Sequence, residues 1–306
     1  MDPQLTKRLT DWLEYMVLRN ACCAFQIFPW PVGRRMARIF GRLAYCLDRG
    51  RRKANASENI CRAFPNMTRA EARDLLKRVY CHLACTILDG FHFARFVRHW
   101  EQEDLFETEG FEKLEGVQDG TGIVFVTGHF GQWEVLGAVA PLIGYPVWSM
   151  GRTFDNVFIE DYIRRLREIT GQRMLGKHGA LRQMVRLVEK GQHVAMLIDQ
   201  DARRHGMFAE FFGRPASTTT APARLAIRTG APVAFVYGQR IAGENRFRIV
   251  LTDVVQPRSD GDRQSETRRI TQRITRDMEE VVRQSPEQWL WLHRRWKTYP
   301  GKYGRQ

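Results

Sequence analysis

The sequence lacks the cysteine patterns of a disulfide scaffold or a zinc cluster. Its six cysteines all lie in the first third of the chain, and no two form a C-x-x-C pair. Cys81 and Cys85 are four residues apart, a spacing that places them on one face of a helix and suits packing. A zinc cluster would bring a second pair of ligands at short spacing. We therefore expect no metal site, and reduced core thiols in a cytosolic environment.

A long uninterrupted apolar run is also absent. The most apolar stretch, residues 15–32, contains Arg19 and Gln26 and is broken by Pro29 and Pro31. A membrane-spanning helix needs about 20 apolar residues in a row, and the N-terminus lacks the positive start and apolar run of a signal peptide. This pattern predicts interfacial or monotopic membrane insertion in place of a transmembrane span.

Acidic residues are too few to balance the basic ones. Lys and Arg total 48 against 34 Asp and Glu, which gives a net charge of +14. Three classes of partner fit such a surplus, namely nucleic acid, an anionic lipid surface and an acidic protein. The segment Trp291–Lys297 sets tryptophan beside cations, an arrangement that suits a lipid–water interface. A solvated basic face around a buried tryptophan is the alternative.

A basic amphipathic helix is predicted directly after the apolar stretch. One stripe would carry arginines and the opposite side apolar residues: Arg34, Arg35, Arg38 and Arg42 against Met36, Ile39, Phe40 and Leu43. Such a helix favours an anionic membrane surface. A core helix with one wet face is the alternative.

The rest of the first hundred residues is also predicted to be helical. One helix covers Arg51–Phe64 and stops at Pro65. Thr68 and Glu71 form a capping-box pattern that opens another, which extends to about Trp100 unless it breaks near Gly90.

From residue 122 onward, short apolar strands alternate with helices. Strands are predicted at 122–127, 147–150, 193–198, 233–237 and 247–251, and helices at 155–169, 180–189, 221–228 and 264–283. Strands separated by helices predict an α/β fold, with a mixed sheet flanked by helices. We divide the chain into a helical N-terminal membrane-associating cap, residues 1–100, and an integrated α/β core, residues 101–306.

The segment Gly128–Glu134 is the strongest candidate for a catalytic site. It follows the first strand and precedes an apolar helix, so His129 lies at the C-terminal end of a strand, where functional residues of open sheets gather. Gly128 and Gly131 permit a sharp turn. His129 and Glu134 are five residues apart and cannot share one face of a regular helix. They can pair if His129 lies in the turn and Glu134 reaches back from the helix.

A carboxylate in that place would fix the tautomer of His129 and leave the other ring nitrogen free to take a proton from an alcohol. No Ser or Cys lies nearby in the sequence to act as a protein nucleophile, which favours direct transfer. Two alternatives stay open on these residues alone. The histidine can be a satisfied structural residue, or one of at most two metal ligands supplied by H-x4-E.

Six blocks follow one another along the chain: H-x4-E at His129 and Glu134, Arg152–Asn156, Arg167, Asp199–Asp201, Phe211–Thr220 and Pro286–Lys297. In this order they resemble the bacterial lipid A biosynthesis acyltransferase family, the late lauroyl and myristoyl transferases. A looser similarity reaches back to Ala54–Pro65. Thr153 departs from the pattern, since many members have proline there.

The resemblance implies a glycerolipid-acyltransferase-like fold and transfer of a fatty acyl chain from a thioester to a hydroxyl of a lipid A precursor. The donor would be acyl carrier protein or acyl-CoA, a co-substrate, so no cofactor is expected. The enzyme would lie on the cytoplasmic face of the bacterial inner membrane. Acyl carrier protein, the phosphorylated acceptor and the inner leaflet are all anionic, which suits the arginine surplus.

The resemblance also implies roles for residues. His129 would be the general base and Glu134 its orienting carboxylate. Arg167, and after it Arg152, would stabilise the oxyanion or hold the acceptor. Asn156, Asp199 and Asp201 would belong to the substrate-binding set, the two aspartates by orienting those arginines or by capping a strand end.

Three other functions remain as rivals. A related branch of the family acylates mannosylated phosphatidylinositol from acyl-CoA. The charge alone would suit a nucleic-acid-binding protein, but the basic residues are spread out and no DNA or RNA module is present, so no nucleic-acid partner is expected. A metal-dependent hydrolase would use His129, His205 and aspartates.

Overall fold

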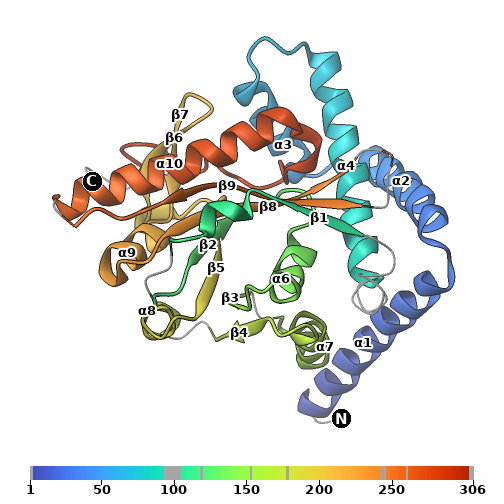
Figure 1. Ribbon diagram of the computed structural model, residues 1–306. Helices are drawn as coiled ribbons and strands as arrows, with labels where there is room; N and C mark the ends of the chain where they lie inside the picture. Colours follow the sequence, from blue (N-terminus) through green and yellow to red (C-terminus); the bar gives the residue numbers. More distant parts are fainter. Residues whose placement is uncertain are drawn as a thin grey trace.

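The computed structural model describes residues 3–92, 105–117, 120–151, 154–176, 179–241, 243, 246–259 and 261–302. Its centre is a seven-stranded sheet in the order β1-β9-β8-β2-β5-β3-β4, with a separate two-stranded sheet β6-β7 (Figure 1). The strands are β1 (Phe106–Glu109), β2 (Val124–Thr127), β3 (Val147–Met150), β4 (Arg173–Leu175), β5 (His193–Leu197), β6 (Met207–Phe211), β7 (Arg214–Thr218), β8 (Val233–Arg240) and β9 (Phe247–Val255).

Helices cover both faces of this sheet and form the N-terminal region. They are α1 (Pro3–Ile27), α2 (Trp30–Leu47), α3 (Arg51–Ala63), α4 (Arg69–Phe91), α6 (Trp133–Leu142), α7 (Val157–Glu168), α8 (Ala180–Glu189), α9 (Ala221–Thr229) and α10 (Arg263–Gln284). Three short 3-10 helices accompany them: η1 (Phe111–Leu114), η2 (Arg203–His205) and η3 (Pro286–Gln288).

The sheet is mixed, which confirms the predicted fold class. Strands β2, β3, β4, β5 and β8 are parallel, while β9 pairs antiparallel with β8, and β1 follows β9 in parallel. Helical crossovers explain the parallel part, because parallel neighbours need a long connection, whereas the short link from β8 to β9 permits an antiparallel hairpin. The sequence patterns missed β1, β4 and the β6-β7 hairpin, which are short and weakly alternating.

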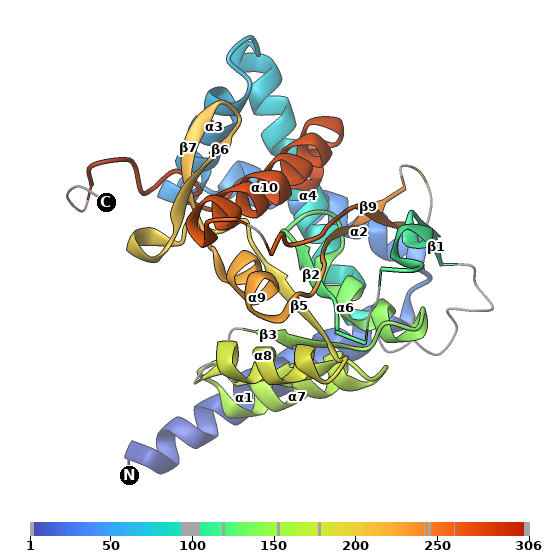
Figure 2. The same ribbon diagram turned by 60° about the vertical axis from the view of Figure 1, so that its left-hand side comes forward.

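Two apolar cores lie on the two faces of the sheet. Helices α8, α9 and α10 bury Met184, Ala226 and Ile274 on one face, and α6 buries Leu136 and Val139 on the other. Figure 2 shows α9 and α10 on the side away from α6 and α7. The space between the sheet and α6 is therefore separated from the main core.

The N-terminal helices confirm most of their predicted boundaries. Thr68 and Glu71 form both hydrogen bonds of a capping box at the start of α4. Helix α4 ends at Phe91, so the predicted continuation to Trp100 and the division at residue 100 fall outside the described residues. No helix in the described ranges is both long and apolar enough to cross a bilayer.

The basic stripe on α2 differs from its prediction at one position. Arg35, Arg38 and Arg42 are exposed as expected, but Arg34 is buried and lies 3.8 Å from a carboxylate oxygen of Asp89 on α4. Arg34 turns inward because α2 packs on α4 along the side that carries it.

The cysteines are all free thiols, as expected. Cys22 and Cys85 are buried, but Cys23, Cys46 and Cys61 are exposed, so the interpretation of the whole set as core residues was wrong. These three lie on the solvent sides of α1, α2 and α3.

Candidate active site

The register of β2 and β5 brings His129 and Asp199 together. Thr127 pairs with Leu197 at the ends of these parallel strands, so the residues two positions further on meet at the same edge of the sheet. Nδ1 of His129 lies 2.7 Å from Oδ1 of Asp199. The backbone N–H of His129 donates to Oδ2 of the same carboxylate over 2.8 Å. Both the ring and the main chain of His129 are therefore held by one aspartate.

Asp199 is fully buried and has a third hydrogen-bond donor. The indole Nε1–H of Trp289 donates to its Oδ2 over 3.0 Å. Burial raises the pKa of Asp199, but the charge and hydrogen bond of His129 outweigh that effect, and the net pKa lies far below the ordinary range. Asp199 is thus a permanent anion, held in place by donors from the turn and from the C-terminal segment.

The electrostatics of His129 suit a base of increased strength. Burial by itself lowers its pKa, but the Asp199 carboxylate and, to a smaller extent, Glu134 raise it, and the net pKa is above the ordinary value. Its other nitrogen, Nε2, lies 3.5 Å from Nε2 of Gln200. The ring of His293 lies 4.8 Å away, centroid to centroid, and that of Trp133 5.4 Å away.

Glu134 does not hold Nδ1 of His129, which corrects the predicted pairing. Its carboxylate instead accepts hydrogen bonds from Arg167 of α7, with Nη2 at 2.9 Å and Nε at 3.1 Å from Oε2. The reason is geometric, because Nδ1 is already occupied by a residue from the neighbouring strand. Glu134, at the start of α6, points across to α7. The distance between Glu134 and His129 allows an electrostatic influence.

The turn that carries His129 needs a glycine at position 131. Gly131 has φ of 57°, a left-handed conformation that other residues rarely adopt. A Cβ there would lie 1.8 Å from the carbonyl oxygen of Gly238 on β8. The next residue, Gln132, is held by helix α4, since its Nε2 donates to the carboxylate of Asp89 over 3.0 Å. The predicted sharp turn is therefore confirmed, and α4 supports it.

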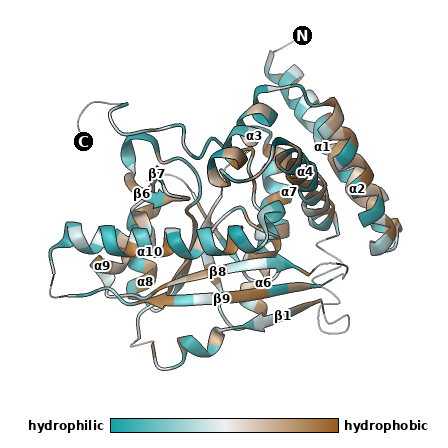
Figure 3. Cartoon of the chain, turned by 90° about the horizontal axis from the view of Figure 1, so that it is seen from above, coloured by the Kyte–Doolittle hydropathy of each residue, from teal (hydrophilic) through white to brown (hydrophobic). Residues whose placement is uncertain are grey.

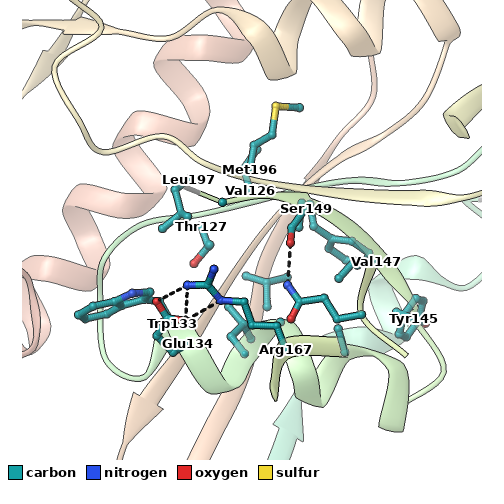
Figure 4. Close-up of a pocket in the computed structure, with 18 of the residues that line it drawn as sticks. Val126, Thr127, Trp133, Glu134, Tyr145, Val147, Ser149, Arg167, Met196 and Leu197 are labelled. Atoms are coloured by element: carbon teal, nitrogen blue, oxygen red, sulfur yellow. Dashed lines mark hydrogen bonds and ion pairs between the residues drawn. The ribbon is translucent and has the colours of Figure 1, made fainter. Parts of the chain in front are cut away.

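An apolar cavity of about 120 Å³ lies between the sheet and α6, next to this turn. Its walls come from α6, β2, β3, β5 and the start of β4, and its lining includes Glu134 and Arg167. Figure 4 shows Glu134 and Trp133 at one end of the cavity, and Tyr145 and Val147 at the other. The site therefore joins a buried base, an ion pair and an apolar channel.

Comparison with known proteins identifies the family. The model of the bacterial lipid A biosynthesis acyltransferase family matches residues 3–298. The chain belongs to this family. It is an acyltransferase.

Relatives of this acyltransferase span nearly its whole length. It is 28% identical to the lipid A biosynthesis palmitoleoyltransferase of Escherichia coli K12 over 94% of this chain and 92% of that one. It is 27% identical to the lauroyltransferase of the same organism, with the same coverage. A solved 1-acyl-sn-glycerophosphate acyltransferase, PlsC from Thermotoga maritima, aligns with 84% of this chain and 99% of its own, at 15% identity and a TM-score of 0.39.

The remaining residues expected in the acyltransferase site are placed differently. Asp201 accepts hydrogen bonds from the backbone and hydroxyl of Thr298 and from the backbone of Arg203, so it holds the C-terminal segment. Asn156 caps α7 and donates to the backbone of Asp11 in α1. Arg152 lies outside the described residues.

The metal-hydrolase hypothesis needs His129, His205 and aspartates to lie together, and the described part of the chain holds no such cluster. His205 is exposed on η2, where its Nε2 lies next to Arg204. Within the described ranges, no group of three or more His, Cys, Asp or Glu side chains is arranged to hold a metal ion.

Sequence reasoning missed three neighbours of His129, namely Gln200, Trp289 and His293. Trp289 and His293 belong to the C-terminal block that carries the strongest family resemblance, but no pattern within the block indicates what it touches. Arg295 explains how the block is fixed over the site, since its buried guanidinium donates to the backbone of Ser217 and the hydroxyl of Thr218. For Gln200 a signal was present in the sequence, since it follows Asp199 at the C-terminal end of a predicted strand, as His129 does.

Proposed function

We propose that this enzyme transfers a fatty acyl chain from a thioester, carried by acyl carrier protein or coenzyme A, to a hydroxyl of a lipid A precursor. The observation that carries the proposal is the His129–Asp199 pair, in which Asp199 holds Nδ1 and the other ring nitrogen, Nε2, lies beside the amide of Gln200. The apolar cavity lined by Trp133, whose ring lies 5.4 Å from that of His129, supports an alkyl-chain substrate.

His129 acts as the general base in this proposal. Because Nδ1–H donates to Asp199, the lone pair is on Nε2, which takes the proton of the acceptor hydroxyl as its oxygen attacks the thioester carbonyl. The resulting tetrahedral oxyanion collapses with cleavage of the C–S bond. The imidazolium then returns the proton to the thiolate that leaves, so the base is regenerated. Asp199 is a positioning residue that also stabilises the transient cation.

Arg167 is the candidate for stabilising the oxyanion. Its guanidinium is about four-fifths buried and lies beside the cavity, fixed by Glu134. A fixed cation in a partly desolvated site stabilises developing negative charge without reorganisation. Glu134 therefore acts through Arg167 and also raises the pKa of His129. Arg152, the second candidate, keeps its proposed role on the family resemblance alone.

The donor's alkyl chain would occupy the cavity between the sheet and α6. Its lining is mainly aliphatic and aromatic, and its polar pair lies at the end where Trp133 is found, the residue whose ring lies 5.4 Å from that of His129. A thioester bound with its carbonyl at Arg167 and its chain directed toward Tyr145 would place the polar group at the ion pair and the alkyl chain against the apolar lining. The depth of this cavity would then set the preferred chain length.

The outer faces of α1 and α2 support association with the cytoplasmic face of the inner membrane. On α2, the exposed Ile39, Phe40 and Leu43 lie next to the exposed Arg38 and Arg42. Figure 3 shows apolar residues along both peripheral helices. Exposed apolar side chains beside arginines suit an interface with anionic lipid. Co-sedimentation with phosphatidylglycerol vesicles, but not with phosphatidylcholine vesicles, tests this localisation, and Phe40→Asp should weaken it.

The test of the function is acyl transfer in vitro. Purified enzyme is given labelled acyl carrier protein or acyl-CoA, with a lipid A precursor or mannosylated phosphatidylinositol as acceptor. We expect transfer to the lipid A precursor. His129→Ala should remove activity by about a thousandfold or more, while the exposed control His205→Ala keeps it. Full activity of folded His129→Ala would eliminate the proposed base.

A further inference from the structure

A second apolar cavity lies on the other side of the Glu134–Arg167 pair. It has a volume of about 240 Å³ and is formed where α1, α4, α6 and α7 meet. Leu18, Leu83, Phe91 and Ile163 contribute apolar walls. Its lining is as predominantly apolar as that of the first cavity, and the proposed donor chain does not occupy it.

The two cavities meet at the reacting end of the site. Trp133, Glu134 and Arg167 line both of them. A chain in each would therefore bring its polar end to the same ion pair, within reach of the turn that carries His129. Acyl transfer between two lipidic substrates needs this arrangement, because the thioester and the hydroxyl must meet while their chains stay apart.

Helix α1 connects the second cavity to the exterior. One side of the helix turns Leu18 and Cys22 toward the cavity. The opposite side exposes Leu9, Leu13 and Val17 by more than half of their surface. An α-helix that is apolar on two opposite sides is suited to lie between a protein core and a lipid phase. An alkyl chain of a lipid beside α1 would then have only this helix to pass before it enters the second cavity.

We propose that the cavity between α1, α4, α6 and α7 binds an alkyl chain of the acceptor lipid. The proposal rests on the acyl transfer proposed above and adds where the acceptor is held. The acceptor is chosen over the donor because the first cavity, which also reaches Arg167, is already assigned to the donor chain. Its phosphorylated head group would remain at the open edge, near Arg167, while one chain is anchored beside α1.

Gly90 allows a direct test. This α4 residue lines the cavity, and a Cβ built on it meets no atom within 4 Å, so a side chain can start there, and Gly90→Leu should take up part of the cavity. Leucine also favours a helix over glycine, so the melting temperature should not fall. Displacing about two buried CH2 groups should raise the KM for a long-chain acceptor roughly tenfold. The KM for the acyl donor should stay unchanged.

Two variants make this result specific. Gly261→Leu is the matched control, since Gly261 is exposed and its Cβ also meets no atom within 4 Å; its kinetics should equal those of the wild type. Ala195→Phe fills the donor cavity instead, and should shift donor preference to shorter chains without raising the acceptor KM. An acceptor with the same head group and two-carbon chains should be equally poor for wild type and Gly90→Leu. An unchanged acceptor KM in Gly90→Leu would overturn the proposal.

Photo-crosslinking separates this proposal from the proposed function. A lipid A precursor with a diazirine near the end of one alkyl chain is irradiated with the full-length enzyme, and adducts are mapped by mass spectrometry. Adducts on the 83–91 segment of α4 support the proposal, and their loss in Gly90→Leu strengthens it. Adducts confined to Leu9, Leu13 or the donor cavity refute it. Crosslinking needs no turnover. If the enzyme forms adducts on α4 but transfers no acyl group, the proposed acyl transfer is refuted, while the proposed binding site for the lipid chain stands.

Discussion

Two ion pairs have opposite characters in this acyltransferase, although His129 of one pair and Glu134 of the other lie only five residues apart in the sequence. The His129–Asp199 pair is buried, joins two parallel strands and has three donors to one carboxylate. The Glu134–Arg167 pair joins two helices, and 42% of the Glu134 side chain is exposed. A pair on strand ends has little freedom, whereas a pair between helix surfaces can adjust to a substrate. The first is suited to fix a base and the second to hold a changing charge.

The largest difference should come from neutralising the buried carboxylate. Asp199→Asn keeps the shape of the side chain but can present its amide to Nδ1, which favours the wrong tautomer of His129. We expect kcat to fall by roughly a thousandfold to ten-thousandfold. Steady-state kinetics on protein with an unchanged circular dichroism spectrum measure this effect. A loss of less than tenfold would mean that Asp199 does not orient the base.

A smaller loss is expected from the exposed pair. Glu134→Gln leaves His129 held by Asp199, and it loosens Arg167, so kcat should fall by about 10- to 100-fold. Arg167→Lys should cost a similar factor because lysine cannot form the forked contact. The loss of kcat in the double variant should be smaller than the product of the two single losses, since the two residues act as a unit. If Glu134→Gln instead matched Asp199→Asn, Glu134 would hold the imidazole during turnover.

The pH dependence of kcat/KM should show how strongly Asp199 and Glu134 each raise the pKa of His129. The base must be unprotonated, and the pKa of His129 is raised above its ordinary value of 6.5, so kcat/KM should rise with pH through a midpoint above that value. Removing a negative neighbour lowers this pKa. The midpoint should therefore move to lower pH in Asp199→Asn, and by a smaller amount in Glu134→Gln. A midpoint that is the same in all three enzymes would exclude His129 as the titrating group.

The smallest effect concerns Asp277 on α10, a buried carboxylate without the donors of Asp199. Among the described residues, its Oδ2 has no hydrogen-bond partner. Burial, opposed by Arg273 and reinforced by Asp253, raises its pKa from 3.8 to about 6. The fold thus favours the protonated form, and this stabilisation is complete below pH 3.8 and is lost as the pH rises through about 6.

Asp277→Asn removes that dependence. At pH 8 we expect the variant to be more stable than the wild type by about 1 to 3 kcal/mol, and at pH 4 nearly equal to it. Urea unfolding at the two pH values measures the difference. A variant that is less stable at pH 8 would show that the ion pair with Arg273 outweighs the burial of Asp277.

Local patterns were sufficient for most of the secondary structure and for the position of the proposed base. The apolar runs predicted the strands β2, β3, β5 and β8, and the capping box predicted the start of α4. His129 was identified because it follows β2 and is flanked by glycines. The elements that were missed, β1, β4 and the β6-β7 hairpin, are short and take their stability from neighbours.

Pairing of the site residues was harder to predict because it depends on contacts distant in sequence. The pairing of Glu134 with His129 was predicted from a turn that would let Glu134 reach back, and from the H-x4-E block of the family resemblance. Both strands that carry His129 and Asp199 had been predicted, but a sequence pattern does not say that β2 and β5 are adjacent or in which register. The pairing of Thr127 with Leu197 brings His129 and Asp199 together, although these two residues are 70 positions apart in the sequence.

The sequence by itself determined the α/β pattern and a histidine at a strand end with a glycine turn beside it, since these features depend on near neighbours in the chain, and its six blocks carried the resemblance to an acyltransferase family. Only the tertiary structure decided which carboxylate holds that histidine, that Glu134 pairs with Arg167, and that two apolar cavities meet at this ion pair. The physical reason is that strand order, strand register and helix packing are set by burial of the whole core, to which every element contributes.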